Sequence, residues 1–189
     1  LVHGGASFAK LGTEGSKGTK VFSLVGKVNR TGLVEVPMGA TLRHLIFDIG
    51  GGIRDGGKFK GIQTGGPSGG CIPEELLDLE IDFDTLKANG SMMGSGGMIV
   101  MDETTCMVEL SRYYLSFFAG ESCGKCTPCR EGLRCMLDIL TRITEGHASM
   151  KDLDLLEDLA YTAKEASLCE LGRTAANPVI STLTWFRDE

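Results

Sequence analysis

The sequence lacks the long apolar segments that a membrane protein or a secreted precursor needs. No stretch near its beginning resembles a secretory signal, and no apolar run is long enough to cross a bilayer. A chain without such a signal belongs in a reducing compartment, where structural disulfides are rare. We therefore expect a soluble, cytoplasmic protein whose seven cysteines are free thiols or metal ligands.

Basic clusters and catalytic histidines are also missing. The 189 residues include 19 Lys and Arg against 25 Asp and Glu, giving a net charge of −6. No basic stripe indicates a nucleic-acid site, so we expect no nucleic-acid partner. His3, His44 and His147 stand apart from any nucleophile or acid-base pair. We accordingly expect no catalytic residue in this chain.

The familiar phosphate-binding motifs are absent as well. Residues 65–71 read GGPSGGC, whose glycines could bring backbone N–H groups close to an anion. The segment matches neither Gly-x-x-x-x-Gly-Lys-Ser/Thr nor Gly-x-Gly-x-x-Gly before a helix. We expect these glycines to allow close packing, against the second half of the chain or against a partner. An anion site is the less favoured alternative.

Four cysteines are the most informative feature that is present. Cys123, Cys126 and Cys129 follow one another at three-residue intervals in ESCGKCTPCREG, and Cys169 lies in SLCELGRTAANP. Such thiolates can hold a four-iron, four-sulfur (4Fe-4S) cluster, with the distant cysteine completing the ligand set. Structural zinc usually pairs two Cys or Cys/His knuckles, and a second knuckle is missing here. We expect an electron-transferring 4Fe-4S cluster; the alternative is a zinc-stabilised structural docking module.

Three cations adjoin the expected ligands. They are Lys125, Arg130 and Arg134. Thr127 is predicted to cap a helix that has proline in its first turn, which places Cys129 at the positive helix end. The cations and the helix end would favour the reduced cluster, because reduction adds negative charge. For Arg134 a solvated surface position explains the charge equally well.

The three remaining cysteines have no evident chemistry. We expect them to be buried thiols that pack as small apolar side chains. They are Cys71, Cys106 and Cys135.

Composition and periodicity change along the chain. Residues 1–70 hold 18 of the 27 glycines and a charge of +5, whereas residues 71–189 have a charge of −11. The first half shows a helix start at Thr41 and β-type runs at 20–28, 33–36, 59–63 and 98–101. Apolar residues then recur at helical spacing over 107–118, 133–143, 153–163 and 179–186. We expect an α+β protein, with a β-grasp domain followed by an all-α four-helix domain.

Five sequence blocks follow one another in a recognisable order. They are GTEGSKGTKVFSLVGKV, TGLVEVPMGATLRHLIFDIGGGI, KFKGIQTGGPSGGCIP, ESCGKCTPCREG and SLCELGRTAANPVIS. Together they resemble the flavin-containing, NADH-oxidising subunit of NADH-quinone oxidoreductase (respiratory complex I). They resemble still more closely the diaphorase subunit of soluble NAD(P)-linked iron hydrogenases. The resemblance implies that Cys123, Cys126, Cys129 and Cys169 are the cluster ligands.

The resemblance also implies a domain organisation. Residues 1–18 would be the tail of an upstream flavin and nucleotide domain, residues 19–103 a soluble-ligand-binding β-grasp domain, and residues 104–189 a four-helix 4Fe-4S domain. FMN and NAD(P)H would bind only in the full-length subunit, through the upstream domain, for which this chain has no counterpart. The chain alone is then expected to be inactive toward nicotinamides.

The residues after the fourth cysteine would face the flavin in such relatives. By resemblance, Leu171 and Gly172 lie on the flavin side of the cluster. Glu170 stands where the family has a small Gly or Ala, so the surroundings of the flavin would differ there. The implied role is to pass single electrons between FMN and further clusters in partner iron-sulfur subunits of a hydrogenase or NADH dehydrogenase complex.

Overall fold

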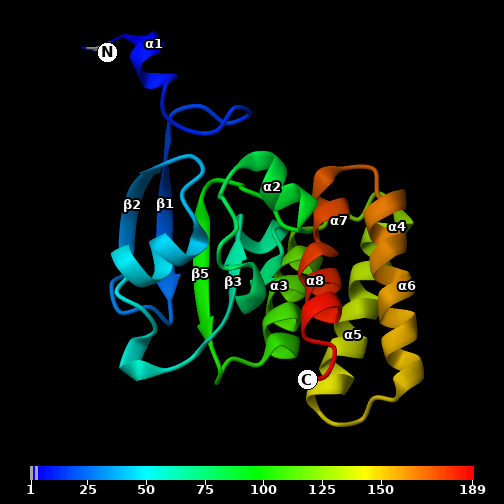
Figure 1. The fold of residues 1–189 in the computed structure, drawn as a ribbon. Coiled ribbons are helices and arrows are strands. Elements are labelled where there is room, and N and C mark those ends of the chain that lie inside the picture. The colour runs from blue at the N-terminus through cyan, green and yellow to red at the C-terminus, as the bar shows by residue number, and fades with distance from the viewer. Residues whose placement is uncertain (1, 3) are drawn as a thin grey trace. The chain divides into compact units, whose positions relative to one another are not determined.

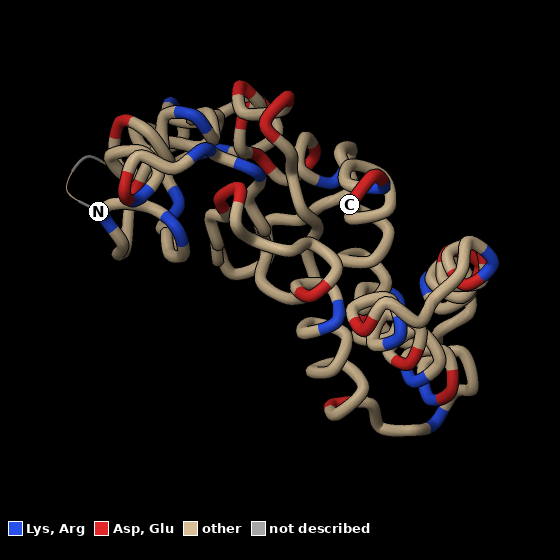
Figure 2. The backbone as a smooth tube through the Cα atoms, turned by 90° about the horizontal axis from the view of Figure 1, so that it is seen from below, with Lys and Arg blue, Asp and Glu red and all other residues tan. Residues whose placement is uncertain are grey.

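The computed structural model describes residue 2 and residues 4–189, so His3 lies outside the described residues. The chain divides into two compact units, one ending at Thr104 and one running from Thr105 to Glu189. Figure 2 shows that basic and acidic positions are interspersed along the backbone of each unit. No helix within the described residues has the length and apolar character required to cross a membrane.

The first unit is built on a mixed sheet of five strands. The strands are β1 (Thr19–Gly26), β2 (Gly32–Pro37), β3 (Phe59–Thr64), β4 (Cys71–Pro73) and β5 (Gly97–Asp102). Their spatial order is β2-β1-β5-β3-β4. β1 and β5 run parallel, and the other neighbouring pairs are antiparallel. The hairpin and the two later strands predicted from the sequence are confirmed. β4 was not predicted, because three residues are too few to show alternation.

Short helical segments accompany the sheet (Figure 1). They are α1 (Gly5–Phe8), η1 (His44–Ile49), η2 (Arg54–Gly56), η3 (Gly66–Ser68), η4 (Glu74–Leu76) and α2 (Phe83–Ala88). The predicted helix start at Thr41 is confirmed, since its hydroxyl accepts a hydrogen bond from the His44 N–H at 3.2 Å. The π form of η1 was not predicted. Phe22 and Leu24 of β1 share a buried core with Leu45 of η1.

The glycine-rich loop at 65–70 packs tightly within its own unit. Gly65 has a φ of 76°, and a Cβ there would meet the Met92 carbonyl oxygen at 2.6 Å. The Ser91 hydroxyl accepts a hydrogen bond from the Gly70 N–H and donates one to the Gly70 carbonyl, each at 2.9 Å. These glycines do allow close packing, but the contacts lie inside the first unit, so the predicted packing against the second half of the chain or a partner stays a prediction.

Helices make up the second unit. The four long ones are α3 (Met107–Glu121), α5 (Gly132–Thr144), α6 (Met150–Ala166) and α8 (Asn177–Trp185), and the short ones are α4 (Thr127–Arg130) and α7 (Glu170–Thr174). Helices thus occupy each segment for which apolar spacing predicted them. Phe118, Leu133 and Leu156 belong to the buried core between them. α4 and α7 lie together at one end of the unit (Figure 1).

The predicted cap at Thr127 was wrong. Cys126 has extended φ and ψ angles and is the N-cap of α4, so Thr127 is already its first helical residue. Cys129 does lie in this first turn, but α4 has only four residues and Glu131 separates it from α5. One turn aligns few peptide dipoles, so the positive end expected beside Cys129 is weaker than a long helix would give.

Burial of the non-ligand cysteines was predicted correctly for one of three. Cys71 is buried, and its thiol donates a hydrogen bond to Gln63 Oε1 at 3.0 Å. Cys106 and Cys135 are exposed. Cys106 is the N-cap of α3, where its Sγ accepts a bond from the Glu109 N–H at 3.5 Å.

Candidate metal centre

The four expected ligands come from two segments that meet at the α4–α7 end of the helical unit. Cys123 and Cys126 lie on the loop after α3, Cys129 lies in α4, and Cys169 is the N-cap of α7. Cys123, Cys126 and Cys169 all act electrostatically on the Cys129 thiol. The fold therefore brings the four sulfurs into one neighbourhood, although forty residues separate the last two in sequence.

Burial and local hydrogen bonds set the acidity of the two inner thiols. Cys129 is 4% exposed, and this burial raises its pKa. The Ser122 hydroxyl, 3.2 Å from Cys129 Sγ, opposes that rise. The pKa of Cys126 is lowered, first by the Leu168 N–H and then by the Cys129 N–H. Backbone donors thus favour the metal-binding thiolate at Cys126, and a bound metal would deprotonate the buried Cys129.

Arg130 supports the loop that bears the first two cysteines. Its guanidinium donates to the Gly124 carbonyl at 2.7 Å and to the Thr127 hydroxyl at 3.4 Å. Gly124 adopts a φ of 74°, a left-handed conformation that favours glycine. Arg130 also pairs with Glu131 at 2.8 Å, which offsets much of its charge. These contacts indicate that Arg130 supports the ligand loop, whereas its predicted electrostatic effect on the cluster stays a prediction. The other two cations, Lys125 and Arg134, have exposed side chains.

Gly172 allows the α7 backbone to pack closely against the buried ligand. A Cβ at this position would meet Ser167 Oγ at 2.6 Å, Ser167 Cβ at 2.7 Å and Cys129 Cβ at 3.0 Å. The neighbouring Leu171 is partly buried against the helical core. The flavin-side role predicted for Leu171 and Gly172 stays a prediction.

Two serines near the thiols were not identified from the sequence. Ser122 approaches Cys129, and Ser167 lies beside Gly172. Serines near cysteines are too common for sequence alone to select these two.

Within residues 2 and 4–189, no three His, Cys, Asp or Glu side chains converge closely enough to share one ion. Tetrahedral zinc needs four ligands at about 2.0–2.3 Å from one centre, whereas the thiolates of a 4Fe-4S cluster bind its separate irons. Four thiols from two segments, with backbone donors at Cys126, are the kind of ligand set that a cluster takes.

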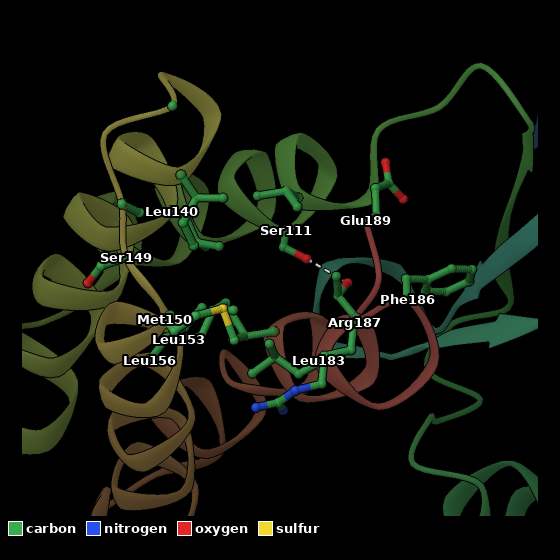
Figure 3. A pocket seen from close by; sticks show the side chains of 16 residues that line it. Ser111, Leu140, Ser149, Met150, Leu153, Leu156, Leu183, Phe186, Arg187 and Glu189 are labelled. Carbon is green, nitrogen blue, oxygen red and sulfur yellow. Dashed lines mark hydrogen bonds between the residues drawn. The ribbon is translucent and has the colours of Figure 1, made fainter.

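The helical unit also contains an apolar cavity away from the four cysteines. It is a cavity of about 480 Å³, lined mainly by apolar side chains such as Leu140, Leu153 and Leu183 (Figure 3). Its hydroxyls Ser111 and Thr182 bond to each other at 2.8 Å, the dashed line in Figure 3. None of the four cysteines lines it. This cavity is therefore separate from the four cysteines at the α4–α7 end.

Residues 109–189 match the profile of a family described as the NADH-ubiquinone oxidoreductase-F iron-sulfur binding region. This segment is therefore similar to that family. It contains all four cysteines and nearly the whole helical unit. The resemblance inferred from the sequence blocks is confirmed, and the family description supports an iron-sulfur cluster in this region.

Curated proteins match this chain over its whole length. The NADP-reducing hydrogenase subunit HndC of Solidesulfovibrio fructosivorans is 51% identical over 189 residues, covering 100% of this chain and 39% of the relative. An NADH-quinone oxidoreductase subunit of Rhizobium meliloti (strain 1021) is 43% identical, over 100% of this chain and 45% of the relative. The chain thus spans less than half the length of these curated relatives.

A solved structure supports the same relationship. A crystal structure of an NAD+-reducing [NiFe]-hydrogenase in the H2-reduced state matches with a TM-score of 0.86 and 32% identity. The match covers 96% of this chain and 30% of that one. The α+β class expected from the sequence is confirmed by this similarity and by the sheet and helices described above.

Proposed function

We propose that this chain is the electron-transfer part of an NAD(P)H-linked flavin and iron-sulfur oxidoreductase subunit of hydrogenase type. Cys123, Cys126, Cys129 and Cys169 would hold its 4Fe-4S cluster. The main support is the meeting of four thiols from two segments around buried Cys129, inside the family-matched region. The names of the relatives, an NADP-reducing hydrogenase and an NADH-quinone oxidoreductase, support the nicotinamide link.

The residues of this chain would serve to hold and shield the cluster. When bound, the cluster supplies one-electron transfer. The Leu168 N–H favours thiolate at Cys126, Arg130 fixes the ligand loop through Gly124, and burial keeps water from Cys129. No general base or nucleophile of the chain is needed for this work.

Flavin and nicotinamide would bind outside this chain. In the proposal, FMN and NAD(P)H are held by the remaining part of the full-length subunit, and Leu171 and Gly172 face the flavin. Electrons would continue to clusters in other iron-sulfur subunits of a hydrogenase or NADH dehydrogenase complex.

The finer domain assignment is also a proposal. A β-grasp domain at residues 19–103 is supported by the strand order with parallel β1 and β5 between antiparallel neighbours. A four-helix iron-sulfur domain at 104–189 is supported by α3, α5, α6 and α8. For residues 1–18, the role of a tail from an upstream domain is supported by α1, which has no buried residues.

Metal and sulfide analysis tests the cluster. Anaerobically prepared protein should contain about four irons and four acid-labile sulfides per chain. Reduction should produce an electron paramagnetic resonance signal. Stoichiometric zinc without sulfide would contradict the proposal and support a structural docking module instead.

A further inference from the structure

We propose that Ser167 is a positioning residue whose hydroxyl donates a hydrogen bond to the Cys126 sulfur when the cluster is bound. This bond would raise the midpoint potential of the cluster. This inference rests on the proposed cluster and adds a determinant of its potential.

Ser167 has a buried hydroxyl that makes no hydrogen bond of regular geometry within the described part of the chain. The residue is 2% exposed, and its Oγ acts on the Cys126 thiol, whose pKa it helps to lower. Other buried hydroxyls of the helical unit are paired, such as Ser111 with Thr182 and Thr174 with the Glu170 carbonyl. Because buried polar groups are almost always bonded, an unpaired one points to a partner that binds later.

The backbone fixes the position of this side chain. The Ser167 N–H donates to the Ala163 carbonyl at 3.2 Å, at the end of α6. The Ser167 carbonyl accepts a bond from Arg173 Nε at 3.0 Å, from α7. Ser167 is therefore held between the helix that precedes Cys169 and the helix that follows it, two residues before that ligand.

The hydroxyl lies on the side of the site where the thiols meet. Ser167 Oγ and Cys129 Cβ both pack against Gly172, so the hydroxyl lies next to the buried ligand. The hydroxyl is also close enough to Cys126 to interact with its thiol. A serine hydroxyl has one donor and can rotate to suit an acceptor, and the Cys126 sulfur is an acceptor on which this hydroxyl acts.

The sign of the effect follows from charge. A cluster with four thiolates becomes more anionic on reduction, and a hydrogen-bond donor stabilises the more negative state more strongly. Removing the donor should therefore disfavour reduction and lower the midpoint potential.

Ser167→Ala in the cluster-containing 189-residue chain tests the inference, because it removes Oγ and keeps Cβ. The equilibrium constant for reduction should fall by up to about tenfold, equivalent to about 59 mV for one electron, with iron and sulfide unchanged. Ser181→Ala is the matched control, since Ser181 is also buried but bonds to the Pro178 carbonyl at 3.2 Å. The control should leave the potential unchanged.

A spectroscopic measurement adds a second readout. Electron-nuclear double resonance of the reduced cluster should detect a strongly coupled proton that disappears in D2O and is absent from Ser167→Ala, whereas coupled protons of the Leu168 and Cys129 N–H groups should remain. If Ser167→Ala loses its iron, Ser167→Thr, which keeps a hydroxyl, decides: the parent potential and coupling support the inference, and an intact cluster without that coupling overturns it. An intact cluster with unchanged potential overturns the inference alone. A parent protein without iron and sulfide overturns the proposed cluster as well.

Discussion

At the scale of single residues, Gly172 has little room for a larger side chain. Gly172→Ala would place a Cβ 2.6 Å from Ser167 Oγ and 3.0 Å from Cys129 Cβ. We expect this overpacking to cost about 1–3 kcal/mol of unfolding free energy and to reduce cluster retention. Thermal unfolding and iron content after gel filtration measure the two effects.

Gly120 offers the matched control for that substitution. It is exposed in α3, and nothing lies within 4 Å of a Cβ built on it. Gly120→Ala should stabilise α3 by up to about 1 kcal/mol, because alanine is the better helix former. Equal effects of the two substitutions would show that space beside Cys129 is not limiting.

The ligand set can be separated from the other cysteines by serine substitution. Cys169→Ser should leave an incomplete or labile cluster, because Cys169 meets the other three ligands around Cys129. Cys106→Ser should retain full iron and sulfide, since Cys106 is exposed at the start of α3, where serine is a preferred N-cap. Metal analysis of both variants provides the comparison. Equal loss of iron from both would mean that the ligand set is wrong.

At the scale of elements, α2 should contribute a pH-dependent part of the stability. Asp82 caps this helix by accepting a bond from the Thr85 N–H at 2.7 Å, and the Thr13 hydroxyl also bonds to it, at 3.2 Å. The Thr85 N–H and hydroxyl are the main causes that lower the pKa of Asp82, with Thr13 adding to them. A lowered pKa stabilises the fold above the unfolded value of about 3.9. That stabilisation is lost as the pH falls through the folded pKa.

Asp82→Asn keeps a capping side chain but removes the titration. The variant should be less stable than the parent by about 1 kcal/mol or less at pH 7. The gap should close as the pH falls below about 4. Denaturant unfolding across this range measures it, with exposed Glu75→Gln as the control. An equal gap at pH 7 and at pH 3 would contradict this account of the cap.

Sequence periodicity predicted the long elements because their apolar residues repeat over several turns. α3, α5, α6 and α8 each bury one face, and that requirement is visible in the sequence. The short α4 and α7 have four and five residues, too few to show a period. The cysteine spacing predicted the candidate cluster ligands. The bond from Arg130 to Gly124 and the unpaired Ser167 hydroxyl depend on tertiary packing, which no local pattern encodes.

At the scale of the whole molecule, electron transfer and nicotinamide oxidation should be separable. The chain spans less than half of its curated relatives, and the proposal assigns FMN and NAD(P)H to the remaining part. The 189-residue chain should therefore not reduce artificial acceptors with NAD(P)H, even when FMN is added. Dithionite should still reduce its cluster, which serves as the control. A longer subunit that includes the flavin domain should be active, and turnover by the short chain would refute this division.

The parallel pairing of β1 with β5 has a consequence for synthesis. Ser23 lies opposite Gly97 at the centre of the sheet, whereas β1 and β2 form a local hairpin. At about 5–20 residues added per second, the hairpin waits several seconds on the ribosome for its other neighbour. During that interval the side of β1 that will receive β5 is an unpaired strand edge, which other chains could pair with. The nascent first unit is therefore most exposed to aggregation before residue 102 has left the ribosome.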